Sequence, residues 1–185
     1  MIKKIFIISF VIILNLHFNA FSDDDVLNYL KEGKKIVFIR HAIAPGNGDP
    51  NNFDINNCNT QRNLDKNGIE QSKKIGQFFH NNKIKIDKVL SSEWCRCKET
   101  AKIAFDDYST NSFLNSFYSS KYAKNKDKQI KALNNYIKKF KSNKNLILVT
   151  HYVLISEVLN YGPSSGEIIV SDKNFNIIGS VEINY

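Results

Sequence analysis

The pattern of hydrophobic and polar positions divides the chain into two kinds of segment, which alternate along the sequence. Short apolar runs have the length and β-branched content of strands, and the strand segments are residues 35–39, 89–90, 145–149, 167–170 and 177–183. Longer segments repeat their apolar side chains at helical spacing, and these are residues 26–32, 66–81, 91–105, 127–141 and 153–160. Because strands alternate with helices, the pattern predicts an α/β fold, a three-layer α/β/α sandwich around a mainly parallel sheet.

The first 22 residues have the pattern of a secretory signal peptide. Lys3 and Lys4 precede an apolar run at residues 5–14, and Ala20 and Ser22 fit a cleavage site between small residues. The alternative is an uncleaved membrane anchor, but the run is shorter than the ~20 residues that a bilayer span requires. We therefore expect residues 1–22 to be removed and residues 23–185 to form a single exported domain, without stable membrane insertion.

Arginine is rare in a chain that is otherwise rich in lysine. The formal net charge is +8, and of 26 basic residues only Arg40, Arg62 and Arg96 are arginines. The lysine-rich stretch at residues 121–144 follows a helical pattern, where a solvated face is expected, and no basic patch interleaved with aromatics indicates a nucleic-acid partner. Arginine offers a planar, bidentate fork to carboxylates and phosphates, so these three positions are candidates for anion binding.

Polar residues of specific kinds follow three of the predicted strands. Arg40 and His41 end the first, Ser91 and Ser92 end the second shortly before Arg96, and Thr150 and His151 end another. Because ligands bind outside the carboxyl ends of strands in open α/β sheets, we expect His41, Arg96 and His151 to meet there. Guanidinium groups stabilise a phosphoryl group, and a neutral imidazole can attack phosphorus, so the pattern indicates phosphoryl transfer. The long polar loop at residues 42–63 borders this edge, and loops of that length are usually functional.

These residues lie within four segments that resemble, in order, the signature segments of the histidine phosphatase superfamily (phosphoglycerate mutase-like). The segments read RHAIAPG from residue 40, RNLDKNGIEQSKKIG from residue 62, SSEWCRCKETA from residue 91 and LVTHYVLI from residue 148. The resemblance is closest to the small, exported, phosphohistidine-phosphatase-like branch, and it implies a phosphoglycerate mutase-like fold.

The resemblance also implies roles for the residues of the predicted site. His41 is the expected nucleophile, His151 completes the pocket, and Arg40, Arg62 and Arg96 bind phosphate. Asn63 and Thr150 are possible supporting residues, although both also fit local turn and strand-end roles. His80 stands among polar residues at a helix end and is expected at the surface.

The expected function is hydrolysis of phosphomonoesters or phosphoramidates through a phosphohistidine on His41, with no cofactor and no metal. The expected substrate is a small phosphorylated compound or a phosphorylated component of the cell envelope, and the expected location is the bacterial periplasm. Two alternatives stay open, namely a lipopolysaccharide-phosphate phosphatase and a binding module that holds phosphate ligands without turnover. The sequence indicates no oligomeric state.

Two departures from the family pattern affect the expected chemistry. Ala42 replaces the glycine after the nucleophile, and no glutamate matches the proton donor of the mutases, since Asn115 stands where an acid is needed. Mutase activity is therefore not expected. Asp49 is the candidate proton donor, with Asp54 in the same loop and Glu157 as further candidates.

Three cysteines remain in the expected mature chain. Cys95 and Cys97 lack the usual spacing of structural zinc ligands, and Arg96 between them opposes a cation, so a disulfide is the better interpretation in an exported protein. Because Cys97 falls at the small buried position of the family pattern, the resemblance favours a bond between Cys58 and Cys95.

Overall fold

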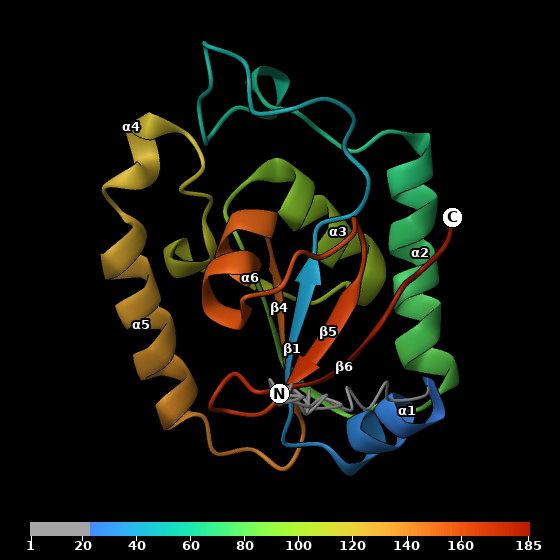
Figure 1. Ribbon diagram of the computed structural model, residues 1–185. Helices are drawn as coiled ribbons and strands as arrows, with labels where there is room; N and C mark the ends of the chain where they lie inside the picture. The colour runs from blue at the N-terminus through green and yellow to red at the C-terminus, as the bar shows by residue number, and fades with distance from the viewer. Residues whose placement is uncertain (1–22) are drawn as a thin grey trace, which may run out of the picture.

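A six-stranded sheet runs through the centre of the protein, with strand order β3-β2-β4-β1-β5-β6 (Figure 1). The computed structural model describes residues 23–185; the predicted signal peptide at residues 1–22 lies outside them. The strands are β1 (Ile36–Arg40), β2 (Ile86–Ser91), β3 (Ser109–Thr110), β4 (Asn145–Thr150), β5 (Ile168–Ser171) and β6 (Ile177–Val181). Neighbouring pairs among β1, β2, β3 and β4 are parallel, and β5 pairs antiparallel with β1 and β6. The predicted mainly parallel sheet is confirmed.

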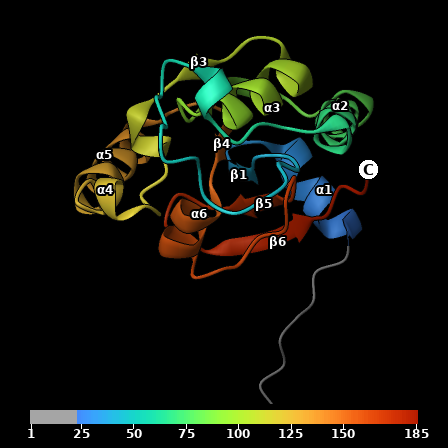
Figure 2. The same cartoon turned by 90° about the horizontal axis from the view of Figure 1, so that it is seen from above.

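Helices cover both faces of this sheet. They are α1 (Asp23–Glu32), α2 (Lys66–Asn81), α3 (Cys95–Phe105), α4 (Ser120–Ala123), α5 (Lys126–Lys139) and α6 (Tyr152–Leu159). Figure 2 looks along the strands and shows α1 and α2 on one side of the sheet and α5 and α6 on the other. Buried side chains of α1, α2 and α3 share one hydrophobic cluster, while those of α5 and α6 share a second. The three-layer arrangement is therefore as predicted.

The central strands are apolar throughout because both of their faces are covered. In β1, Val37 and Ile39 belong to the cluster under α2 and α3, whereas Ile36 and Phe38 belong to the cluster under α5 and α6. Residues 36–39 are all fully buried. Each such side chain contributes roughly 1.5–3 kcal/mol by leaving water, so a polar substitution on either face of β1 would be costly.

Helix α2 has the bounds that the periodicity predicts, and its first turn explains why. The Asp65 carboxylate accepts a hydrogen bond from the Gly68 backbone N–H at 2.8 Å and so caps the helix. A Cβ atom on Gly68 would lie 2.0 Å from the Ile43 carbonyl oxygen. Glycine therefore lets the helix approach the backbone that follows the predicted nucleophile His41.

The structure differs most from the predicted elements between residues 106 and 125. The sequence pattern predicts only an irregular stretch there, but the chain forms β3, a 3-10 helix at Ser112–Leu114 (η2) and α4. Phe113 and Leu114 are buried in the cluster under α5, although they follow neither a helical nor a strand period. These elements are too short to produce a periodic signal.

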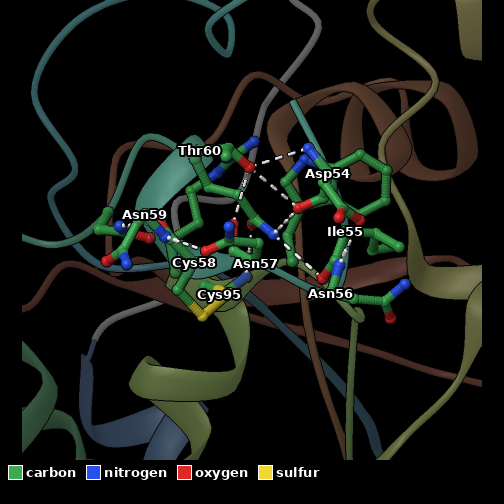
Figure 3. The surroundings of a disulfide bond; sticks show 12 residues. Asp54, Ile55, Asn56, Asn57, Cys58, Asn59, Thr60 and Cys95 are labelled. Atoms are coloured by element: carbon green, nitrogen blue, oxygen red, sulfur yellow. Dashed lines mark hydrogen bonds between the residues drawn. A yellow bond between two sulfur atoms is a disulfide. The ribbon is translucent and has the colours of Figure 1, made fainter. Parts of the chain in front are cut away.

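A disulfide between Cys58 and Cys95 ties the long loop to the start of α3, which confirms the predicted pairing (Figure 3). Cys58 begins a 3-10 helix, Cys58–Thr60 (η1). Gln61 reinforces the connection, because its side-chain oxygen accepts a hydrogen bond from the Cys95 backbone N–H at 2.9 Å. The Gln61 amide nitrogen also donates to the carbonyl oxygens of Asp54 and Ile55. The loop is therefore fixed to the helix that carries Arg96.

Candidate active site

A pocket of about 520 Å³ opens at the carboxyl ends of the central strands. In Figure 1, β1 points toward the long loop that crosses this end of the sheet. The side chains predicted to bind and attack a phosphoryl group all line the pocket: Arg40, His41, Asp49, Arg62, Arg96 and His151. The structure therefore brings together residues that are up to 111 positions apart, because β1, β4 and α3 deliver them to one edge of the sheet.

His41 is held as a neutral imidazole with one nitrogen available to accept. Its Nδ1 lies 2.8 Å from the Ala42 carbonyl oxygen, and because a carbonyl only accepts, Nδ1 carries the proton. Nε2 then carries the lone pair and accepts a hydrogen bond from Arg96 Nε at 3.2 Å. Burial, followed by the charge of Arg96, holds the pKa of His41 well below its ordinary value. The unprotonated nitrogen that nucleophilic attack requires is thus maintained.

Arg96 is the side chain around which the pocket is organised. It is 3% exposed, and its terminal nitrogens donate to both oxygens of Asp49, Nη1 at 2.7 Å and Nη2 at 3.2 Å. The same guanidinium contacts both imidazoles, since Nε donates to His41 and Nη2 lies 3.4 Å from His151 Nδ1. Asp49 thereby fixes Arg96 with one edge toward the two histidines.

Asp49 is in the pocket as predicted, but its surroundings do not suit a proton donor. Its carboxylate accepts from Arg96, from Trp94 Nε1 at 3.1 Å and from the Arg62 backbone N–H at 3.2 Å. Burial raises the pKa of Asp49, but the hydrogen bonds and charge of Arg96, with the other donors, outweigh burial and lower the pKa overall. The carboxylate is therefore ionised in this arrangement, and the geometry assigns it the positioning of Arg96. Its role as proton donor stays a prediction.

Arg40 and Arg62 complete a cluster of three guanidiniums. Arg40 donates to the Pro163 carbonyl oxygen at 2.8 Å, while its buried Nε has no hydrogen-bond partner among residues 23–185. Arg62 donates to the carbonyl oxygens of Gly48 and Ala44. Burial, with the charge of Arg96 as a further cause, lowers the pKa of both groups. An anion among these side chains would relieve their mutual repulsion and satisfy the Arg40 Nε–H.

A chain of hydrogen bonds fixes the tautomer of His151. Arginine only donates, so His151 Nδ1 accepts from Arg96 and Nε2 carries the proton. Nε2 donates to Ser92 Oγ at 2.8 Å, and Ser92 in turn donates to Asn115 Oδ1 at 3.1 Å. Burial, followed by the charges of Arg96 and His41, holds the pKa of His151 well below its ordinary value. His151 is therefore neutral and in contact with Arg96 through its unprotonated nitrogen.

Asn115 is a positioning residue whose part in the site the sequence did not reveal. Its Oδ1 also accepts from the Glu93 backbone N–H at 2.9 Å, and its Nδ2 donates to Glu93 Oε2 at 2.6 Å. These bonds orient the amide so that its oxygen faces Ser92. The sequence suggests that an acid is missing at position 115. In the structure, Asn115 at this position is the last member of the series of hydrogen bonds that orients His151. Ser92 is the middle member of these hydrogen bonds, and Trp94 occupies the N-cap position of α3 without a capping bond from its side chain.

Several other sequence-predicted residues lie outside the pocket. Thr150 donates to the Leu114 carbonyl oxygen at 2.6 Å, and Asn63 donates to the Cys58 carbonyl oxygen at 2.7 Å, so both have local structural contacts. Glu157 forms an ion pair with Lys126 at 2.8 Å on the outer surface of α6. Asp54 does not line the pocket, and His80 is exposed at the end of α2, as predicted. Glu157 does not line the pocket, and its role as a proton donor stays a prediction.

The free cysteine lies beside the second histidine. The sulfur of Cys97 lies 3.5 Å from His151 Nε2, and burial raises the pKa of its thiol to about 12. The thiol therefore stays protonated and acts as a small buried side chain.

Within residues 23–185, no group of three or more His, Cys, Asp or Glu side chains is arranged to hold a metal ion. No helix in the same part of the chain is long and apolar enough to cross a membrane.

Comparison with known proteins gives a family for this arrangement. Residues 36–115, which contain His41, Arg62 and Arg96, match the profile of the histidine phosphatase superfamily (branch 1). The match supports phosphatase activity, and it ends before His151, which the fold brings to the same pocket.

Individual proteins and solved structures are also similar to this chain. The mitochondrial serine/threonine-protein phosphatase Pgam5 of Drosophila willistoni is 32% identical over 89 residues, which are 48% of this chain and 28% of the fly protein. The chain thus spans little more than a quarter of that relative. A putative phosphohistidine phosphatase SixA from Agrobacterium tumefaciens has a TM-score of 0.55 at 19% identity, covering 80% of this chain and 98% of its own. The phosphoglycerate mutase from Thermus thermophilus has a TM-score of 0.56 at 12% identity, covering 81% and 99%. These two structures establish the phosphoglycerate mutase-like fold.

Proposed function

We propose that this protein is an exported, metal-independent phosphatase that hydrolyses phosphomonoesters or phosphoramidates through a phosphohistidine on His41. The observation that carries the proposal is the state of His41. Its imidazole is neutral, its Nε2 lone pair is unprotonated, and three guanidiniums line the pocket around it. A neutral nucleophile beside cations is what attack on a phosphate dianion requires.

The first step transfers the phosphoryl group to His41. The Nε2 lone pair attacks phosphorus, the P–N bond forms, and the P–O or P–N bond to the leaving group breaks. The leaving group departs with the bonding electron pair and is protonated by solvent. Arg40, Arg62 and Arg96 stabilise the charge on the equatorial oxygens, an effect worth about 10²–10³ in rate for a single well-placed donor.

The second step returns the enzyme to its starting state. Water attacks the phosphorus of phospho-His41, the P–N bond breaks, and its electron pair returns to Nε2. The proton lost by water is taken up by the phosphate product or by the unprotonated Nδ1 of His151. His151 therefore serves as a local base, and once its Nδ1 has taken up a proton it can donate a hydrogen bond to the phosphate oxygens.

Export to the periplasm belongs to the same proposal and is supported by two features. Residues 1–22 have the charge and hydropathy pattern of a signal peptide, and residues 58 and 95 form a disulfide. Disulfides persist in oxidising compartments and are rare in the cytosol. Mass determination of the protein from the outer compartment of the producing cell tests this part, with the expected mature chain starting at Asp23.

A second candidate function is a binding module that holds a phosphorylated ligand without turnover. One observation favours it: Asp49, the one carboxyl group that lines the pocket in the described part of the chain, is ion-paired with Arg96. A site with no free acid can bind a phosphate without efficiently expelling a poor leaving group.

Hydrolysis of p-nitrophenyl phosphate with EDTA present tests the proposal. The oxidised mature protein should turn over this substrate, and His41→Ala should lose activity by about three orders of magnitude or more. His80→Ala is the matched control, since His80 is exposed and outside the pocket. Turnover that survives in His41→Ala would exclude the proposed nucleophile. Saturable binding of inorganic phosphate without hydrolysis would favour the binding module.

A further inference from the structure

The rim of the pocket carries aromatic rings that the proposed chemistry does not use. Four large hydrophobic side chains are exposed in residues 23–185, and two of them, Tyr118 and Tyr152, line the pocket. Tyr118 is 62% exposed and Tyr152 is 45% exposed. Exposed aromatic side chains at the mouth of a concave site indicate contact with a ligand, because a ring gains a large contact area at little entropic cost.

The wall below this rim is aromatic as well. Phe53 from the long loop stacks on Trp94 with ring centroids 5.0 Å apart, and Tyr122 of α4 meets both rings edge-on. All three line the pocket. Trp94 also contacts the ring of His151 at 5.4 Å, so the aromatic wall continues to the floor where the phosphoryl group would be held.

The carboxyl groups of the pocket also favour a substrate with an aromatic group. Among residues 23–185, Asp49 is the one carboxyl group that lines the pocket, and it is ionised and bound to Arg96. Alkoxide leaving groups need a proton as they depart, whereas phenolates are far more stable anions and leave without one. A pocket without a free carboxyl group is therefore matched to an aromatic leaving group.

Resting on the proposed function, we infer that the preferred substrates are aryl phosphomonoesters, with the phosphoryl group on the histidine and arginine floor and the aromatic ring against Tyr118 and Tyr152. His41 Nε2 forms the bond to phosphorus as the P–O bond to the phenol breaks, and the phenolate leaves with the electron pair. Tyr118 is the residue of choice for a test, because Tyr152 lies 5.5 Å from the Arg40 guanidinium and its loss would disturb phosphate binding.

The test compares phenyl phosphate with glycerol 2-phosphate in the wild type, Tyr118→Ala and Tyr118→Phe. Tyr118→Ala should raise KM for phenyl phosphate about 2- to 10-fold, the effect of one aromatic pair, with little change in kcat. KM for glycerol 2-phosphate should not change, and Tyr118→Phe should behave like the wild type. Tyr185→Ala is the matched control, since Tyr185 is also 62% exposed but does not line the pocket. A Tyr118→Ala effect that is equal for both substrates, or absent for both, would overturn the inference.

A binding measurement separates this inference from the proposed function. Phenylphosphonate and methylphosphonate carry the same anionic head and resist hydrolysis, so calorimetric titration reports recognition alone. Tighter binding of phenylphosphonate that is lost in Tyr118→Ala supports the aromatic subsite, even for a protein that hydrolyses nothing. Equal affinity for the two phosphonates would overturn it, even for an active phosphatase.

Discussion

The floor and the rim of the pocket are built in different ways. On the floor, His41, Arg96 and His151 are each 3% exposed and lie at the ends of β1 and β4 or in the first turn of α3. On the rim, Tyr118 is 62% exposed and lies outside any regular element, between η2 and α4. The floor is held by buried hydrogen bonds and the rim by a loop, a disulfide and short helices. In the proposed function, chemistry resides on the buried floor and substrate selection on the exposed rim.

After the loss of His41 itself, replacing Arg96 should have the largest effect, because this side chain connects the floor to the rim. In Arg96→Lys, a single ammonium cannot contact His41, His151 and both oxygens of Asp49. We expect kcat/KM for p-nitrophenyl phosphate to fall about 10²- to 10³-fold. Lys98→Arg on α3 is a control outside the pocket. Wild-type kinetics in Arg96→Lys would remove Arg96 from contact with the transferring group.

Removing the disulfide should affect the rim more than the floor. The bond between Cys58 and Cys95 spans 37 residues, and its loss in the doubly substituted Cys58→Ser/Cys95→Ser protein should lower the free energy of unfolding by about 3–4 kcal/mol. We expect KM to rise while kcat changes less, because the strand ends that hold the histidines stay in place. Urea denaturation with and without reductant measures the stability. Reductant should lower the urea midpoint of the wild type and leave that of the double variant unchanged. Equal urea midpoints for the two proteins without reductant would contradict the prediction.

Breaking the hydrogen-bond chain at Ser92 should affect the floor alone. Ser92→Ala removes the acceptor of the His151 Nε2 proton, which frees the imidazole to change its tautomer. We expect kcat to fall about 10-fold, as for loss of one buried hydrogen bond, with KM nearly unchanged. The pH profile of kcat should shift as well, since the solvation of His151 changes. Ser119→Ala, at an exposed residue of the rim, is the control. An equal fall of kcat in both variants would contradict a specific role of the Ser92 hydrogen bond.

The buried histidines should also make stability depend on pH. The pKa values of His41 and His151 lie well below 6.5 in the folded state, so below about pH 6.5 the unfolded chain binds more protons than the folded protein. The free energy of unfolding should therefore decrease as pH falls from about 6.5, by about 1 kcal/mol per pH unit for each imidazole. The lowered pKa of Asp49 contributes in a separate window, below about pH 4. Urea unfolding at several pH values measures the slope, and a flat profile between pH 5 and 7 would contradict neutral, buried imidazoles.

The fold and the floor could be predicted because their signals are local. Continuous apolar runs identify strands covered on both faces, Asp65 is a capping residue just before α2, and two histidines and two of the three arginines stand at or shortly after strand ends. The meeting of strand ends at one edge of the sheet follows from the parallel topology alone.

The rest depends on contacts that no local pattern encodes. Asp49 looks like a proton donor in sequence, but only the tertiary structure shows that Arg96 and Trp94 hold its carboxylate. Asn115 accepts a hydrogen bond from Ser92, which is 23 residues away in the sequence. Tyr118 lies in a segment whose helices and strands are too short to give a periodic pattern. The rim is therefore the part of the molecule for which the structure adds most.

The central claim is that His41 carries the phosphoryl group during turnover. The most direct measurement is to mix the protein with radiolabelled substrate, quench in alkali to preserve phosphohistidine, and locate the label by peptide mass spectrometry. The account predicts a transient label on the peptide that contains His41, stable to alkali, lost in acid and missing from His41→Ala. Label on another residue, or turnover with no labelled protein at any time, would contradict the account.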